Sequence, residues 1–204
     1  MAVSFDLFGT LVDADTPDDP AAAVARELRE RGVAVPDDFG AAYREVHIDA
    51  PDGAEVPLPA HVSAALSSRG VDAPNNASRR AVVAAFDPDI NRREGARRAI
   101  EAAADHGPVG LCSNCSVPEL VRRTLVRADL TDAFDAVVTS VGCGWRKPDA
   151  RAFETVARRL DTDLAVHVGD EAATDGGATA VSAEYVDIAE TPLPSLSGRL
   201  EAIL

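Results

Sequence analysis

The sequence is almost without lysine. Lys147 is the only lysine among 20 basic residues, and 34 acidic residues bring the formal net charge to -14. A protein that binds the phosphate backbone of nucleic acids needs clustered Lys and Arg side chains to displace counterions. The charge balance therefore argues against a nucleic-acid partner.

The acidic excess with so little lysine has two explanations. A protein from a high-salt cytoplasm tolerates many surface carboxylates because mobile ions screen their repulsion. GC-rich codon usage also favours Arg over Lys and raises the alanine content. Both explanations remain open, and the dependence of the melting temperature on salt concentration separates them.

Cysteine is also scarce. Cys112, Cys115 and Cys143 are too few, and odd in number, for a disulfide framework. Cys112 and Cys115 form one C-x-x-C pair, but no second pair completes a zinc site. We therefore expect the three cysteines to be reduced. Because Cys112 ends an apolar run, we expect it to pack in a strand.

Long apolar runs are absent as well. No segment approaches the roughly 20 apolar residues that span a bilayer, and Asp6 interrupts the only apolar run at the amino terminus. We therefore expect no membrane partner and a cytoplasmic location.

What the sequence does contain is an alternation of short apolar runs with helical patterns. The 204 residues allow one α/β core with one insertion. The runs predicted to be strands are residues 3–8, 109–112, 136–139, 165–168 and 184–188; helical patterns at 118–128, 150–160 and 172–181 separate the last four. Strand-helix-strand alternation predicts an α/β fold with a doubly wound parallel sheet of about five strands.

The interval between the first two strands is helical in pattern and contains no strand-like run. Helices are predicted at 20–31, 38–48, 58–69 and 77–86, followed by one at 94–106 that rejoins the core. We expect residues 14–87 to form a small helical cap and residues 1–13 with 88–204 to form the core. The segments 13–20 and 86–92, rich in Asp and Pro, are the expected hinges.

Polar side chains follow four of the predicted strands. Asp6 ends the first, and Gly9-Thr10 turn the chain away from the sheet; Ser113-Asn114 end the second. Trp145-Arg146-Lys147 follow the third, and Asp170 and Asp175 follow the fourth in a G-D-x-x-x-x-D pattern. Each signal alone is weak, but ligands bind at the carboxyl ends of parallel strands, so the set is expected to converge on one site.

In this order the set resembles the haloacid dehalogenase superfamily, over essentially the whole chain and including a helical cap inserted after the first motif. The resemblance implies a hydrolase with a Rossmann-like core in which Asp6 is the nucleophile and forms an aspartyl-phosphate. It implies Mg²⁺ held by Asp6, the main-chain carbonyl of Phe8 and Asp170, with Asp175 in close support.

The resemblance also implies roles for the neighbouring residues. Lys147 would offset charge and orient Asp6, Ser113 would hold the transferring oxygens, and Thr10 would position the nucleophile by a hydrogen bond. Asn114, Trp145, Arg146 and, in the cap, His47 are the candidates for substrate contact. The expected substrate is a small phosphorylated metabolite, and the expected oligomeric state is a monomer or a homodimer.

Phe8 departs from the pattern of most phosphatases of the superfamily, which carry a second Asp there as general acid and base. A phenyl ring transfers no proton, and such help is typically worth a factor of 10² to 10⁴. Haloacid dehalogenases are aromatic at this position and need no metal, but their fourth motif lacks the Gly-Asp found here at Gly169-Asp170. A hydrolase that forms a Schiff base with a cap lysine is excluded because Lys147 is the sole lysine.

Three hypotheses about the function therefore remain: a phosphatase, a dehalogenase-like hydrolase, and a catalytically silent protein that keeps the fold. The phosphatase reading leads because of Asp170 and Asp175. It needs a proton from elsewhere, for which His47 and His61 in the cap are candidates. His167, inside a predicted strand, is expected to be a core residue.

Overall fold

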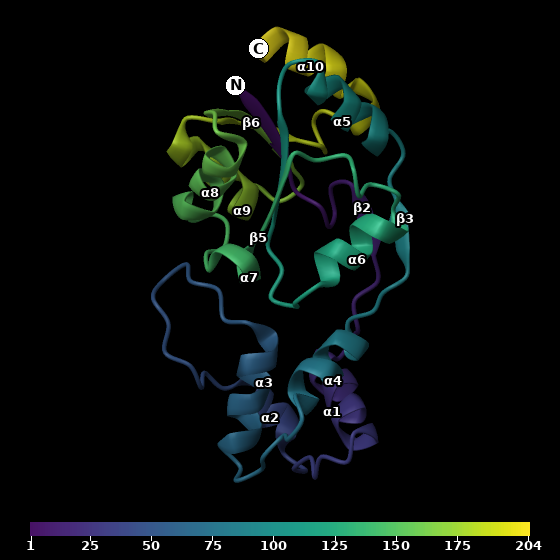
Figure 1. Cartoon of the computed structure of the whole chain (residues 1–204), viewed down its shortest axis with the longest axis vertical. Helices are drawn as coiled ribbons and strands as arrows, with labels where there is room; N and C mark the ends of the chain where they lie inside the picture. Colours follow the sequence, from purple (N-terminus) through teal and green to yellow (C-terminus); the bar gives the residue numbers. More distant parts are fainter.

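A parallel sheet forms the centre of the molecule (Figure 1), and the computed structural model describes all residues, 1–204. Its five strands lie in the order β5-β4-β1-β6-β7. They are β1 (Ala2–Phe5), β4 (Val109–Ser113), β5 (Ala136–Thr139), β6 (Leu164–Gly169) and β7 (Glu184–Asp187). This order confirms the predicted doubly wound α/β fold, and each strand coincides with a predicted run to within a few residues.

Helices cover both faces of the sheet, which explains why its central strands β1 and β4 are buried along their whole length. All four residues of β1 are buried. On one face, α8 (Ala150–Leu160) buries Phe153 and Val156 against β4 and β5. The other face is covered by α5 (Ala96–Ala104), α6 (Leu120–Arg127) and α10 (Leu196–Ile203), whose apolar side chains join the larger core.

A helical insertion lies at the opposite end of the molecule from the two termini (Figure 1). It comprises α1 (Pro20–Glu30), α2 (Phe39–Arg44), α3 (Leu58–Ser67) and α4 (Ala77–Ala85). The helix predicted at 38–48 is shorter than expected because Glu45, with φ -79° and ψ 149°, is extended and ends it. Residues 45–57 instead form a long loop that returns toward α7 (Ser140–Cys143).

The prediction that no strand lies between the first two sheet strands is wrong. β2 (Val12–Ala14) and β3 (Ile90–Arg92) pair as an antiparallel ribbon. Each has only three residues, too few to show an alternation, and its partner lies far away in the sequence. The ribbon ties together the two connections between core and insertion, and it occupies part of both predicted hinges.

The helix predicted at 172–181 is also interrupted. α9 (Ala172–Asp175) ends at Gly176-Gly177, and a 3-10 helix, η1 (Gly176–Val181), continues it. A second 3-10 turn, η2 (Leu193–Ser195), precedes α10. Two consecutive glycines disfavour an α-helix, and a Cβ at Gly177 would lie 2.3 Å from the Pro148 carbonyl oxygen. The break leaves Asp175 at the last turn of a short helix beside the sheet edge.

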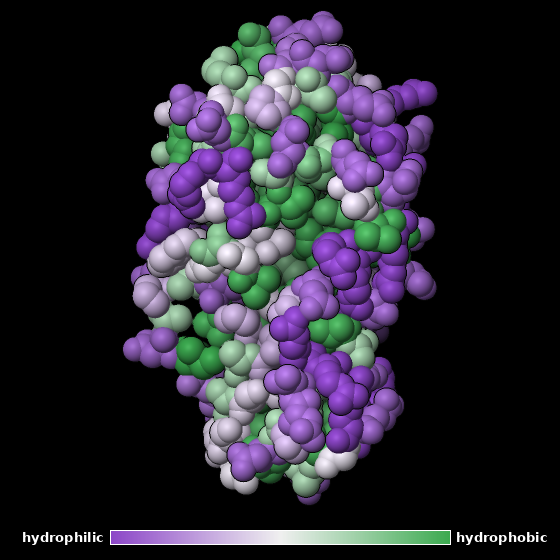
Figure 2. Space-filling view, viewed as in Figure 1, coloured by the Kyte–Doolittle hydropathy of each residue, from purple (hydrophilic) through white to green (hydrophobic).

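None of the helices has both the length and the apolar content needed to cross a membrane. Polar side chains cover much of the face seen in Figure 2, and apolar patches gather across its middle, where the sheet meets the insertion.

Candidate active site

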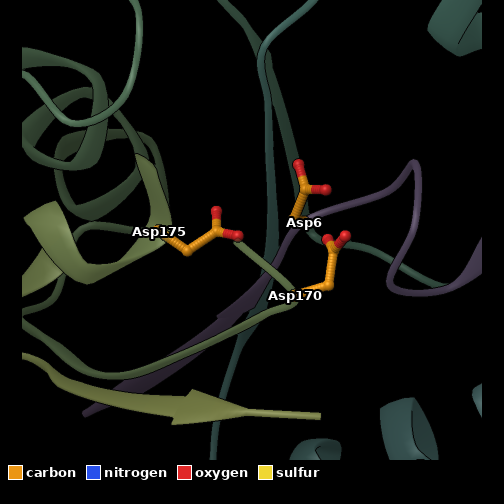
Figure 3. Close-up of side chains that lie close together, drawn as sticks. All are labelled: Asp6, Asp170 and Asp175. Atoms are coloured by element: carbon orange, nitrogen blue, oxygen red, sulfur yellow. The ribbon is translucent and has the colours of Figure 1, made fainter. Parts of the chain in front are cut away.

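Three carboxylates converge at the carboxyl edge of the sheet (Figure 3). Asp6 follows β1, Asp170 follows β6, and Asp175 ends α9. Ligand oxygens of the three lie within 4.8 Å of one another. Asp6 and Asp175 are buried, whereas Asp170 is exposed. The four strand-end motifs therefore do bring the predicted acidic residues together.

Two glycines make this convergence sterically feasible. Gly9 has φ +86°, and a Cβ there would lie 2.3 Å from Asp170 Oδ2. A Cβ on Gly169 would lie 2.2 Å from Asp175 Oδ2. Any larger residue at either position would displace a carboxylate of the site.

Lys147 is the cation at the centre of the cluster. Its Nζ lies 2.7 Å from Asp6 Oδ1 and 2.5 Å from Asp175 Oδ1, and its side chain is buried. Burial alone would lower the pKa of Lys147, but the charges of Asp6 and Asp175 raise it above its ordinary value. The sole lysine is therefore a permanent cation at neutral pH.

Asp6 is in an environment that disfavours its charge. Burial raises its pKa to about 6, and repulsion by Asp175 adds to this while Lys147 opposes it. A buried carboxylate with a strongly raised pKa in a polar pocket is a feature of functional sites.

Thr10 does not contact Asp6 as expected. Its Oγ1 donates to Asp170 Oδ1 at 2.8 Å, so it orients the exposed carboxylate of Asp170 instead of Asp6. The tight turn at Gly9 carries Thr10 past Asp6 and toward the end of β6. Residue order alone does not reveal which carboxylate such a hydroxyl reaches.

Ser113 presents a buried hydroxyl group to the site. It ends β4, is buried, and its Oγ has no hydrogen-bond partner. It lines a pocket of about 230 Å³ with Asp6, Phe8, Lys147, Asp170 and Asp175, to which Asn114, Arg146, Glu171 and Thr174 also contribute. An unpaired buried hydroxyl facing a polar pocket suits an incoming oxygen ligand.

Asn114 was expected to bind substrate, but its side-chain amide is occupied. Nδ2 donates to the Lys147 carbonyl at 2.9 Å, and Oδ1 accepts from the Lys147 N–H at 2.8 Å. The pair fixes the main chain of Lys147 and so aims its ammonium. Asn114 lines the pocket, but its polar groups hold the lysine.

Of the two residues before Lys147, only Arg146 faces the pocket. Trp145 is absent from its lining; its ring lies 3.2 Å from the guanidinium carbon of Arg151 and packs against the α8 side of the core. The expected substrate contact by Trp145 is therefore wrong for this structure, because its indole turns inward to pack.

His47 and His61 also lie away from the pocket. His47 Nε2 lies 2.6 Å from the Ala42 carbonyl, and His61 Nε2 lies 2.7 Å from the Tyr43 carbonyl. Their rings pack together in the insertion, 5.8 Å apart. The structure thus does not bring His47 to the site, because local hydrogen bonds engage it.

Glu55, in the loop 45–57, contacts the site although no sequence pattern indicates it. Its carboxylate accepts from Arg146 Nη1 at 2.8 Å and from the Ser140 hydroxyl, and its N–H donates to Gly144 at 2.8 Å. Arg146 N–H in turn donates to Gly53 at 2.9 Å. The loop is therefore docked on the segment that carries Lys147, a contact between distant segments that no local pattern announces.

A second pocket, of about 290 Å³, adjoins the first, since both are lined by Phe8, Asn114 and Arg146. Half of its lining is hydrophobic, including Phe86, Val117 and Leu120. It lies between core and insertion, with Phe8 at the junction.

The acidic cluster fits a divalent cation. Three carboxylates and one ammonium leave two negative charges. Asp175 already accepts from Lys147, from Glu171 N–H at 3.1 Å, and from His167, which leaves oxygens of Asp6 and Asp170 free. Carboxylate oxygens are the ligands that Mg²⁺ prefers.

A family model for haloacid dehalogenase-like hydrolases matches residues 1–180, and the chain belongs to this family. No curated protein matches the sequence. The fold is similar to a 2-haloacid dehalogenase from Pseudomonas syringae pv. Tomato DC3000, at 18% identity, TM-score 0.62, and 98% and 96% coverage of the two chains.

Two further solved structures share the fold. The putative hydrolase YfnB from Bacillus subtilis, bound to magnesium, is 18% identical with TM-score 0.54 and coverage of 99% and 97%. CbbY from Rhodobacter sphaeroides, in complex with xylulose-(1,5)bisphosphate, is 19% identical with TM-score 0.58 and coverage of 90% and 84%. The chain is thus a haloacid dehalogenase-like hydrolase.

Proposed function

We propose that the protein is a Mg²⁺-dependent phosphohydrolase that acts on a small phosphorylated metabolite through an aspartyl-phosphate at Asp6. The observation that supports it best is the group of Asp6, Asp170 and Asp175 around Lys147, whose residual charge of two matches a divalent cation. A metal-independent dehalogenase has no use for this acidic excess.

Asp6, the carbonyl of Phe8 and Asp170 would hold the ion, with Asp175 in close support. When bound, the ion supplies positive charge that lets an anionic nucleophile approach a phosphate dianion. Such neutralisation also favours the ionised form of Asp6, whose pKa is about 6 without it.

The protein's own groups carry out the rest. One oxygen of Asp6 attacks phosphorus in line and forms an acyl phosphate as the leaving oxygen departs. Lys147 donates to Asp6 Oδ1 and so orients the carboxylate, while the unpaired Ser113 hydroxyl donates to a phosphoryl oxygen. Water then cleaves the acyl phosphate at phosphorus and returns Asp6.

The leaving group departs without a proton from residue 8, because Phe8 has none to give. This favours substrates whose leaving group is stable as an anion, such as acyl or aryl phosphates. The pocket lined by Phe8, Phe86 and Leu120 has the position and the apolar character to hold such a group. In this account the helical insertion acts as the cap that completes the substrate site.

A second candidate is a dehalogenase-like hydrolase that forms an aspartyl ester at Asp6. Phe8 favours it, since expulsion of halide needs no general acid. The acidic cluster opposes it, because two negative charges remain after Lys147 pairs with Asp6 and Asp175.

A paired assay separates the two. Phosphate release from a panel of aryl, acyl and alkyl phosphates is measured with Mg²⁺, and halide release from 2-haloacids is measured with a chelator. The proposal predicts phosphate release that the chelator abolishes and no halide release. Metal-independent halide release would overturn it, and Asp6→Asn is the control that removes either activity.

A further inference from the structure

His167 links the interior of the sheet to the acidic cluster. It lies in β6 directly opposite Ser4 in β1, and both side chains are completely buried. Ser4 Oγ lies 2.7 Å from His167 Nδ1, and His167 Nε2 lies 3.1 Å from Asp175 Oδ1. Phe153 of α8 packs edge-on against the imidazole, with ring centroids 5.0 Å apart, and fixes its plane. The expectation that His167 is a core residue is right about its burial, but the ring also has polar partners at both nitrogens.

Only one protonation pattern of His167 satisfies both contacts in the neutral state. Because the imidazole is completely buried and Lys147 already provides the cation that pairs with Asp175, the ring is neutral and carries a single N–H. The ionised Asp175 can only accept, which requires the hydrogen on Nε2. Nδ1 is then an acceptor, and the Ser4 hydroxyl must donate to it.

We propose that Ser4 and His167 are positioning residues for the reaction: the Ser4 hydroxyl donates to His167 Nδ1 and holds the ring, whose Nε2–H holds Asp175 Oδ1 against Lys147.

The consequence reaches Asp6 through Lys147. Asp175 Oδ1 accepts from His167 and from Lys147, which also donates to Asp6 Oδ1. Burial would raise the pKa of Asp175, but the hydrogen bond from His167 and the charge of Lys147 lower it below its ordinary value. If His167 presented a lone pair instead, it would repel Asp175, and the carboxylate would turn away from Lys147. The ammonium would then lose one of the two anchors that aim it at Asp6.

A packing role alone makes different predictions. It requires a ring of this shape between Phe153 and the sheet, but it is indifferent to the tautomer and to the hydroxyl of Ser4. The two roles are therefore separable by removing the Ser4 hydroxyl while leaving the ring in place.

The first measurement is nitrogen-15 NMR of the histidine side chains in the full chain at neutral pH, without metal. The spectrum of His167→Gln identifies the signals of His167 among the four histidines. We expect the pure Nε2–H tautomer in the wild type, and in Ser4→Ala the same tautomer with a shifted Nδ1 signal, because Nδ1 loses the hydrogen bond from the Ser4 hydroxyl. Ser78→Ala is the matched control, because Ser78 is also buried and its hydroxyl has no partner, but it lies in the insertion. An Nδ1–H tautomer or a doubly protonated ring in the wild type, or an Nδ1 signal that does not move in Ser4→Ala, would overturn the proposal.

The second measurement is kinetic and rests on the proposed function. With Mg²⁺ and an aryl phosphate, Ser4→Ala is expected to lower kcat roughly tenfold with KM changed less than about twofold, which is typical for the loss of an outer-shell partner. His167→Gln, whose amide can donate from the position of Nε2, is expected to retain more kcat than His167→Leu. Equal losses in the two, at equal folded content by circular dichroism, would contradict a positioning role. If the wild type releases no phosphate, the proposed function fails while the NMR result still decides the tautomer.

Discussion

Lys147 donates to Asp6 Oδ1 at 2.7 Å, and this ion pair joins the only lysine of the chain to the proposed nucleophile. The same ammonium binds Asp175, so one cation serves two buried carboxylates. Burial nevertheless raises the pKa of Asp6 to about 6, so a bound cation or a proton would stabilise this carboxylate.

Asp6→Asn is expected to abolish activity and to stabilise the metal-free protein at pH 7. The pKa of Asp6 is raised from 3.8 to about 6, so ionisation of Asp6 weakens folding as pH rises through 6. At about 1.4 kcal/mol per unit, the neutral amide removes a penalty of up to about 3 kcal/mol. Urea unfolding in the presence of EDTA measures it. Asp132→Asn alters an exposed carboxylate and is the control, so its free energy of unfolding should change little. A lower free energy of unfolding in Asp6→Asn would contradict the inference that burial disfavours the charge of Asp6.

Acid is expected to weaken the fold through His167. Its pKa falls from 6.5 in the unfolded chain to about 4 in the folded one, so protonation favours the unfolded state. The stabilisation is complete above pH 6.5 and is lost as pH falls through 4, by about 3 kcal/mol at 1.4 kcal/mol per unit. Asp6 titrates with the opposite sign in this window, so the measurement belongs in Asp6→Asn without metal.

The comparison is with the double variant Asp6→Asn, His167→Gln. Between pH 6.5 and 4 its unfolding free energy should fall less steeply than that of Asp6→Asn alone. Parallel curves would show that His167 is not held neutral in the folded protein.

Gly9→Ala is expected to weaken Mg²⁺ binding roughly tenfold or more, because the new methyl group would displace Asp170. Gly32→Ala is a matched control: Gly32 has φ +77°, close to the +86° of Gly9, but no atom lies within 4 Å of its added Cβ. Both variants should lose about 1 kcal/mol of stability from left-handed strain. Isothermal titration calorimetry with Mg²⁺ should then show weaker binding in Gly9→Ala alone, and equal affinity in the two would argue against Asp170 as a ligand.

Phe8→Asp restores a carboxylate where most phosphatases of the superfamily have one. For alkyl phosphates, whose leaving groups need a proton, the rate should rise roughly 10- to 100-fold. For aryl phosphates the gain should be small, so the dependence of the rate on leaving-group pKa should flatten. Phe8→Asn keeps the size without the proton, and an equal gain in that variant would show that acid catalysis is not the cause.

The parts of the fold found from sequence are those with strong local patterns. β1, β4 and β6 are buried on both faces and read as apolar runs, and the residues that follow them meet because parallel strands end at one edge. β2 and β3 were missed because three residues show no period and their pairing depends on distant contacts.

The site shows the same division. The positions of Asp6, Asp170, Asp175 and Lys147 follow from topology, so the sequence locates them. Hydrogen-bond partners depend on side-chain directions, which explains why Thr10 was assigned to the wrong carboxylate and Asn114 to substrate. The position of His167 inside a buried strand predicts only a packing role. Its second role depends on the tertiary contact with Asp175, which the sequence does not reveal.

The most direct test is mass spectrometry of the peptide that contains Asp6 after the protein is mixed with Mg²⁺ and an aryl phosphate and quenched rapidly in acid. We expect this peptide to gain the mass of one phosphoryl group. The phosphoryl group should be absent when EDTA is added, and the Asp6→Asn variant should never acquire it. Phosphate release without any phosphoryl group on Asp6, or an adduct on Asp6 only from 2-haloacids, would contradict it.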